Sequence, residues 1–254
     1  MKKGEVYRCI IEKNIFPATG ICTLEGQEVS IQGAYQGEEI DFRLGRKKKG
    51  LPTGRLLTER RGPCNQYGHC GGCVSQHLPL ERQREIKKME VIDLFKRRGF
   101  MLNELSIYGA EEAFKYRNKV ELNFGNTYKD GPLQLGFYER HMGRNVLATT
   151  ECLLIHEDLR KIRETMLDFA KTKSYDFYHV MRREGFLRHL ILRRGFHTGE
   201  IMVNLVTTTQ QELDPSFVEH LLNLELEGEI VSILDTENDS LSNFVYCDKI
   251  NLLY

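Results

Sequence analysis

The residues of this sequence that are best suited to chemistry are four cysteines. Three of them form a C-x5-C-x2-C cluster within residues 63–73, and the fourth lies in a distant segment. They are Cys64, Cys70, Cys73 and Cys152. Thiolates are ligands of zinc and of cubane iron–sulfur clusters, both of which are commonly held by four protein groups. The sequence therefore predicts a metal centre that takes three ligands from one loop and a fourth from elsewhere in the chain.

The arrangement of these cysteines favours an iron–sulfur cluster. Structural zinc usually takes its ligands as two short pairs, whereas here three thiols share a single loop with Gly68, Gly71 and Gly72. Glycines let the backbone wrap closely around a cluster and point its amides at the sulfurs. Zinc stays open as an alternative because His69 and His77 are also available as ligands. Buried cysteines without a metal are the third possibility.

The other cysteines and the composition indicate the compartment. Cys9, Cys22 and Cys247 lie in strand-like segments, where we expect them to be small apolar core residues. Seven cysteines are an odd number that does not suit a closed disulfide framework, so we expect a cytoplasmic protein. The sequence has no apolar run of about 18 residues and no secretory signal behind Met1, so we expect no membrane partner.

The formal net charge is zero, but the charges are unevenly distributed. Residues 43–61 carry eight basic side chains and one acidic one, whereas residues 209–239 carry nine acidic side chains and no lysine or arginine. A basic segment of this kind can bind a polyanion such as RNA. The run Arg46, Lys47, Lys48 and Lys49 is expected in a loop between two strands. A solvated hairpin tip is the alternative explanation for it.

Two structural regions are expected around the cysteines. Residues 1–58 alternate short strand-like runs with glycine-bearing turns, which predicts a small all-β, OB-like barrel. Loops of such barrels commonly bind oligonucleotides. Residues 59–254 predict an α+β domain that has a mainly antiparallel sheet and contains the cysteine loop.

Within the second region, local patterns place the individual elements. Pro79 and Gly99 bracket an amphipathic helix over residues 80–98. Its apolar stripe, formed by Ile86, Met89, Ile92 and Phe95, requires a packing partner. The alternation of residues 114–125 predicts a half-buried strand. A hairpin is expected between residues 186–194 and 200–208, helices near 156–172 and 214–224, and strands near 133–139, 229–234, 243–247 and 250–254.

The motifs in these segments resemble those of the bacterial iron–sulfur RNA (uracil-5-)-methyltransferases that modify 23S ribosomal RNA. Residues 63–73 together with Cys152 look like the cluster loop of that family. Residues 16–21 and 37–40 are similar to its N-terminal TRAM domain, an RNA-binding β-barrel. The segments similar to its central domain are residues 116–120, 136–138, 185–190 and 248–254, so the resemblance covers the whole chain.

The resemblance implies a [4Fe-4S] cluster on the four cysteines and a ribosomal RNA partner, with no role for DNA. It also implies a cytoplasmic enzyme that is monomeric at full length. In this family a C-terminal domain binds S-adenosylmethionine, and a cysteine of that domain attacks C6 of the uridine before C5 is methylated. Because this sequence shows no motif of that domain, we expect an RNA-binding and substrate-positioning part without catalytic residues. The helix over residues 80–98 is then expected to pack on the absent catalytic domain.

RNA binding is expected to depend on contacts between phosphates and basic side chains, and therefore to weaken steeply with salt. The candidates are Arg46, Lys47, Lys48, Lys49, Arg60, Arg61, Lys115, Arg117 and Lys119. A transfer RNA substrate is an alternative to ribosomal RNA.

Two other classes of function stay open. One is a zinc-stabilised RNA-binding module without an enzymatic parent, and the other is a complete enzyme that uses Glu121, His141 or His189 in its own sheet.

Overall fold

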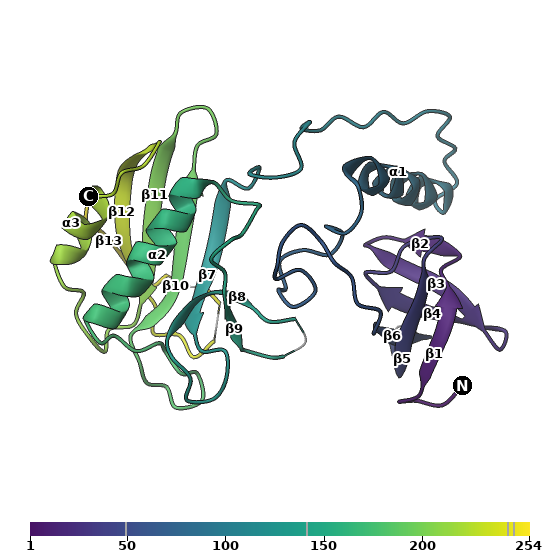
Figure 1. The fold of residues 1–254 in the computed structure, drawn as a ribbon, viewed down its shortest axis with the longest axis horizontal. Helices are drawn as coiled ribbons and strands as arrows, with labels where there is room; N and C mark the ends of the chain where they lie inside the picture. The colour runs from purple at the N-terminus through teal and green to yellow at the C-terminus, as the bar shows by residue number, and fades with distance from the viewer. Residues whose placement is uncertain (49, 141, 243, 246) are drawn as a thin grey trace. The chain divides into compact units, whose positions relative to one another are not determined.

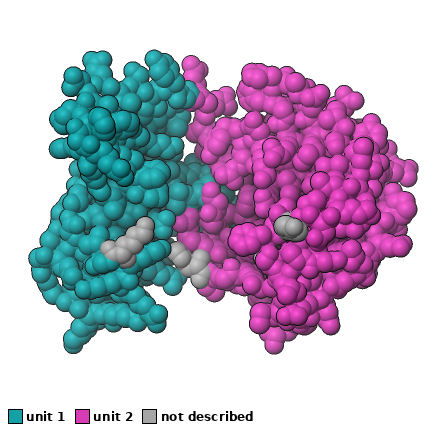
Figure 2. Space-filling model, turned by 180° about the vertical axis from the view of Figure 1, so that it is seen from behind, with its two compact units in different colours: residues 1–68, 73–109 teal, residues 69–72, 110–254 magenta. Residues whose placement is uncertain are grey.

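The computed structural model describes residues 1–48, 50–140, 142–242, 244–245 and 247–254. Its contacts divide the chain into two units, of which the first comprises residues 1–68 and 73–109 and the second residues 69–72 and 110–254 (Figure 2). The division into domains that the sequence predicts at residues 58 and 59 stays a prediction. Within the described ranges, no helix has both the length and the apolar composition that crossing a lipid bilayer requires.

The first unit is built on a six-stranded sheet with the strand order β1-β5-β6-β4-β3-β2 (Figure 1). The strands are β1 (Val6–Ile10), β2 (Lys13–Ile15), β3 (Thr19–Leu24), β4 (Gln27–Gln32), β5 (Glu39–Lys48) and β6 (Leu51–Leu56). The pairs are antiparallel except for β4 and β6, which run parallel. Alternate side chains such as Val29, Ile31 and Phe42 form the core. A Cβ at Gly54 would lie 2.4 Å from the Phe42 ring, so this close approach of β6 requires glycine.

The second unit is built on a seven-stranded sheet with the order β13-β12-β11-β10-β7-β8-β9. The elements are β7 (Lys119–Gly125), β8 (Gln134–Tyr138), β9 (Val146–Ala148), α2 (Glu157–Thr172), β10 (Leu187–Arg194), β11 (Glu200–Thr207), α3 (Ser216–Leu222), β12 (Glu229–Glu237) and β13 (Lys249–Leu252). Strands β11 and β12 are parallel and the other neighbours antiparallel. Helix α2 lies across one face of this sheet, beside α3 (Figure 1).

The fold class expected from the sequence is wrong. The residues that the structure describes form two mixed β-sheets with few helices, and they do not show an OB-like barrel followed by an iron–sulfur domain. Among the described residues, the edge strands β1 and β2 are not paired with each other, so hydrogen bonding does not close the first sheet. Glycine-bearing turns predict where strands end, but they carry no information about which strands pair.

Helix α1 (Leu80–Lys96) belongs to the first unit and packs against β2 through a narrow part of its surface. Ile86 is buried, and Glu90 is buried with its carboxylate 3.0 Å from the backbone nitrogen of Ala18. Met89 and Phe95, two members of the stripe predicted from the sequence, are exposed. Packing of this stripe on a catalytic domain stays a prediction.

Helix α2 is fixed to its sheet by a buried carboxylate. Asp158, in the first turn of α2, is 1% exposed. It accepts hydrogen bonds from Arg194 Nε at 3.0 Å and from the backbone N–H groups of Glu227 and Gly228 at 2.9 and 3.0 Å. Burial raises the pKa of Asp158, but these hydrogen bonds outweigh it and hold the pKa below its ordinary value.

The strand expected near residues 243–247 is not found at the positions that the structure describes there, and Asn243 and Tyr246 lie outside the described residues. In the segment just before it, residues 238–242, three backbone carbonyls accept from one buried guanidinium. Arg188 donates to the carbonyl oxygens of Asn238, at 2.9 Å, Ser240, at 2.9 Å, and Ser242. Strand-like residue types cannot reveal contacts of this kind, because Arg188 is at least 50 residues away in the sequence.

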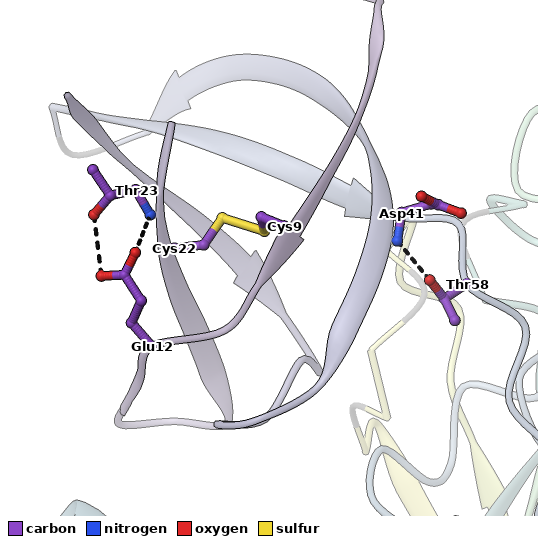
Figure 3. The surroundings of a disulfide bond; sticks show 6 residues. All are labelled: Cys9, Glu12, Cys22, Thr23, Asp41 and Thr58. Atoms are coloured by element: carbon purple, nitrogen blue, oxygen red, sulfur yellow. Dashed lines mark hydrogen bonds between the residues drawn. A yellow bond between two sulfur atoms is a disulfide. The ribbon is translucent and has the colours of Figure 1, made fainter. Parts of the chain in front are cut away.

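Cys9 and Cys22, expected to be unpaired core residues, are joined by a disulfide between β1 and β3 (Figure 3). Both are buried, as their strand-like surroundings predicted. The pairing differs from the expectation because it depends on the approach of two strands that are not hydrogen-bonded neighbours.

Candidate functional site

The four cysteines selected by their spacing are divided between the two units. Cys64 and Cys73 belong to the first unit, whereas Cys70 and Cys152 belong to the second. Among the residues that the structure describes, no group of three or more His, Cys, Asp or Glu side chains is placed to hold a metal ion. The predicted [4Fe-4S] cluster, and zinc as its alternative, therefore gain no support from the described side chains, and the set of four cysteine ligands stays a prediction.

Two of the loop thiols lie close to amide donors. In the second unit, the Gly72 N–H donates to Cys70 Sγ at 3.4 Å. In the first unit, the side-chain amide nitrogen of Gln76 lies 4.0 Å from Cys73 Sγ, while its Oε1 accepts from the Cys64 N–H at 3.3 Å. Amide donors stabilise sulfur that acts as a ligand. The Gly72 contact confirms the expectation that a glycine amide points at a cysteine sulfur.

A single carboxylate ties the segment around the first-unit cysteines to the six-stranded sheet. Glu38, just before β5, accepts from His77 Nε2 at 2.9 Å, from the Tyr35 N–H at 2.7 Å and from the Arg60 guanidinium. The Tyr67 hydroxyl lies 2.6 Å from His77 Nδ1. Burial raises the pKa of Glu38, but the hydrogen bonds from His77 and Tyr35 and the charge of Arg60 outweigh it, so this pKa is lower than usual.

This network also includes two residues that have alternative interpretations. His77, a possible zinc ligand by its position, has both ring nitrogens within hydrogen-bond distance of other side chains. Arg60, a candidate for RNA binding, donates to Glu38 and to the Gly33 carbonyl oxygen, and its side chain is 11% exposed. Both side chains thus have structural partners, whereas the adjacent Arg61 is exposed.

The basic run that was expected in a loop lies mostly in a strand. Arg46, Lys47 and Lys48 are exposed residues at the end of β5. Lys47 and Lys48 pair with Pro52 and Leu51 of β6 across a register shift. Lys49 lies outside the described residues. For Arg46, Lys47 and Lys48 the prediction of a loop was wrong, because backbone pairing leaves these side chains in solvent and composition therefore does not distinguish this strand end from a loop.

Cys152 lies in the second unit beside two of the RNA-binding candidates. Its side chain is buried in the segment between β9 and α2. The next two residues accept backbone hydrogen bonds, Leu153 from the Lys115 N–H and Leu154 from the Arg117 N–H, both at 2.9 Å. Lys115 is exposed and Arg117 half-buried. The predicted cysteine ligand and the predicted phosphate-binding residues are therefore neighbours within one unit.

The residues of the alternative enzyme hypothesis do not form a catalytic group among the described residues. His189 in β10 is 2% exposed, its Nδ1 lies 3.1 Å from Asn123 Oδ1, and burial together with a neighbouring positive charge lowers its pKa to about 4. Glu121 carries an ion pair at 3.2 Å with the exposed Lys119. His141 lies outside the described residues. His189 is thus a neutral core residue.

Sequence reasoning missed a cavity of about 490 Å³ in the second unit. Its lining includes aromatic side chains and three basic ones, Lys129, Arg144 and Arg182. These residues belong to segments that are far apart in the sequence. The one local sign was the aromatic cluster at residues 175–178, between a predicted helix and a predicted strand.

Comparison with known proteins shows what this chain is similar to. No protein-family model matches the chain. It is 37% identical over its whole length to an uncharacterized RNA methyltransferase of Clostridium tetani, of which it covers 58%. It is 33% identical, again over its whole length, to an uncharacterized RNA methyltransferase of Caldanaerobacter subterraneus, of which it also covers 58%.

A solved structure gives the same indication. The structure resembles the crystal structure of the Pyrococcus abyssi tRNA (uracil-54, C5)-methyltransferase in complex with S-adenosyl-L-homocysteine, with a TM-score of 0.68 and 26% identity. The similarity covers 96% of this chain and 54% of that one. The homologues are thus RNA methyltransferases of the uracil-C5 type, which confirms the resemblance at that level. The chain spans little more than half the length of these relatives.

Proposed function

We propose that this chain is the RNA-binding and substrate-positioning part of an S-adenosylmethionine-dependent RNA (uracil-5-)-methyltransferase. The observation that carries the proposal is the similarity to RNA methyltransferases along the entire chain, at 37% identity for the Clostridium tetani protein. Exposed basic side chains in both units, such as Lys48, Arg61, Lys115 and Lys119, supply the contacts that phosphates require. We assign no catalytic residue and no S-adenosylmethionine contact to the described residues.

The test is a measurement of RNA affinity as a function of salt. The wild-type chain is expected to bind structured RNA with a strongly negative slope of log affinity against log salt. The double variant Lys115→Ala/Lys119→Ala is expected to reduce the slope by about 2, because each phosphate contact contributes about 1. Lys171→Ala, at an exposed position of α2, is the control. A wild-type chain that does not bind RNA would contradict the proposal.

For the RNA itself we propose 23S ribosomal RNA, as the motif resemblance implies, with transfer RNA as the second candidate. The second candidate is favoured by the Pyrococcus abyssi neighbour, which acts on tRNA. Competition between a 23S fragment and a tRNA transcript for the same labelled RNA, at one fixed salt concentration, distinguishes them.

We also propose that Cys64, Cys70, Cys73 and Cys152 are ligands of a [4Fe-4S] cluster. The proposal depends on the chemistry of the four thiols and on the amide donors near two of them, because the described side chains are not arranged as a metal site. Iron, zinc and sulfide analysis of anaerobically purified protein tests it. Cys152→Ser is expected to lose the iron, whereas Cys247→Ser, at an exposed cysteine, is expected to retain it. One equivalent of zinc without iron would contradict the proposal.

A further inference from the structure

The cavity in the second unit has the size of a ligand site. Its volume of about 490 Å³ lies within the range of roughly 300–1,000 Å³ that is typical of small-molecule pockets. Three separate segments form its walls: the end of β7 with the turn after it, the end of β8 with residues 144–145, and residues 177–182 before β10.

The third wall is held in place by its backbone. The Tyr178 N–H donates to the Leu187 carbonyl at 2.8 Å, and the His179 N–H donates to the Glu184 carbonyl at 2.7 Å. At Gly185 the φ angle is +114°, and a Cβ there would lie 2.1 Å from the carbonyl oxygen of residue 177. Only glycine permits this close approach. The turn that carries the third wall therefore has a specific, hydrogen-bonded backbone conformation.

One aromatic ring of the cavity lies against a buried guanidinium. The Arg188 guanidinium lies over the Tyr178 ring at 4.3 Å from its centroid. Arg188 is itself buried and bonded to the carbonyl oxygens of Asn238 and Ser240. Because the guanidinium cannot move freely, the ring of Tyr178 is held in one orientation.

The aromatic side chains of the lining differ in how exposed they are. Phe124 and Tyr178 are buried, whereas Tyr138 and Phe177 are half-buried. The ring of Phe177 lies 6.2 Å from that of His179, which also lines the cavity. Aromatic side chains that remain partly accessible in a pocket provide faces on which a planar base can stack.

Positive charge accompanies these rings. Lys129, Arg144 and Arg182 line the cavity and are exposed, while Asp130 is the carboxylate residue of the lining. This local excess of positive charge occurs in a chain whose formal net charge is zero. An apolar ligand would give these cations no function, and a small inorganic anion would give the aromatic rings none. A nucleotide, which combines a planar base with a phosphate, uses both.

We infer that this cavity binds one unstacked nucleotide of the RNA, with its base against the aromatic wall and a neighbouring phosphate on the basic residues. The inference rests on the proposed function, since it takes the polymer to be RNA. It adds a recognition site that shares no residue with the nine basic candidates found by sequence. Base stacking in a pocket selects single-stranded or extruded nucleotides, because a base inside a duplex has no free face.

The experiment combines photocrosslinking with affinity measurements on the whole chain. A uridine-rich RNA oligonucleotide that carries 4-thiouridine is irradiated with the wild-type protein, and crosslinked peptides are identified by mass spectrometry. We expect crosslinks within residues 177–182 or at Tyr138. Phe177→Leu is expected to weaken binding about tenfold, the equivalent of about 1.4 kcal/mol of lost stacking. Arg182→Ala is expected to reduce the salt slope by about 1.

A matched control lies next to the tested residue. Arg183 is exposed in the same turn but does not line the cavity, so Arg183→Ala changes the net charge equally and is expected to leave affinity and crosslinks unchanged. Circular dichroism verifies that each variant is folded. If Phe177→Leu does not fold, Arg182→Ala decides the question, because its side chain is exposed.

The outcomes separate this inference from the proposed function. If the wild-type chain binds RNA but crosslinks elsewhere, and Arg182→Ala binds as Arg183→Ala does, the cavity is not a nucleotide site while the proposed function stands. If the wild-type chain binds no RNA, both are overturned. If uridine monophosphate suppresses the crosslinks at the same concentration as the oligonucleotide, the cavity is a mononucleotide site and the RNA assignment is wrong.

Discussion

Replacement of Glu38 by glutamine should loosen the segment that carries Cys64 and Cys73. The carboxylate accepts three hydrogen bonds, from His77, Tyr35 and Arg60. Glutamine has nearly the same shape but one acceptor oxygen and no charge, so at least one of these donors loses its partner.

The size of the effect follows from burial. The side chains of Glu38, Arg60 and His77 are 22%, 11% and 10% exposed. Breaking a fully buried ion pair costs about 3–5 kcal/mol, whereas an exposed pair is worth about 0–1 kcal/mol. For this half-buried network we expect a loss of about 2 kcal/mol in the free energy of unfolding of the first unit.

The effect should also depend on pH. The pKa of Glu38 is lower in the folded protein than its ordinary value of 4.5. The ionised network therefore contributes its full stabilisation above the ordinary value and loses it as the pH falls through the lowered pKa. Wild type and Glu38→Gln should differ at pH 7 and converge in stability in acid below pH 4.5.

The assay is hydrogen exchange of backbone amides, measured peptide by peptide, together with urea unfolding. Exchange in residues 57–68 and 73–79 should become faster in Glu38→Gln, while the sheet of the second unit should exchange as in the wild type. Glu39→Gln, at the adjacent exposed carboxylate, removes the same charge and is the control. Equal exchange and equal unfolding midpoints for the two variants would refute the argument that Glu38 anchors this segment.

Two further predictions concern the second unit. Asp158→Asn should lower the unfolding free energy of this unit by about 3–4 kcal/mol, because the substitution leaves the charge of the 11%-exposed Arg194 side chain without its buried partner. Urea unfolding measures this effect, with Asp168→Asn at an exposed site as the control. Equal unfolding midpoints for the two variants would contradict the prediction. Because the pKa of His189 is lowered from 6.5 to about 4, acid protonates the unfolded chain first, so stability should fall by about 3 kcal/mol between these pH values. His189→Gln should remove that part of the pH dependence, and unfolding curves from pH 7 to pH 4 that match the wild type would show that the ring titrates normally.

Local patterns predicted individual elements well. The hairpin expected between residues 186–194 and 200–208 is present as β10 (Leu187–Arg194) and β11 (Glu200–Thr207). The helix between Pro79 and Gly99 is present as well, and Gly99 has the positive φ of +83° expected beyond a helix end. These features depend on residues close in sequence, where propensity and capping determine the conformation.

Features that depend on distant segments could not be predicted in this way. The parallel pairing of β4 with β6, the disulfide between Cys9 and Cys22 and the cavity each require that two or three remote segments meet. Residue spacing within one segment carries no information about contacts between distant segments. The spacing of the cysteine loop likewise identified suitable thiols, but it could not show how the described residues place them.

Burial and partners, more than residue type, decide which basic residues are available to the RNA that we propose as the ligand. Arg60 and Arg61 are adjacent in sequence and equivalent by composition, yet Arg60 donates to Glu38 and is nearly buried, while Arg61 is exposed. Arg188 and Arg182 differ in the same way, since Arg188 donates to backbone carbonyls and lies over an aromatic ring, whereas Arg182 is exposed at the cavity. A guanidinium whose donors already serve the fold would lose those bonds on binding a phosphate, so its contribution to RNA affinity would be small. The proposed phosphate-binding surface should therefore be sought among the exposed members of each pair.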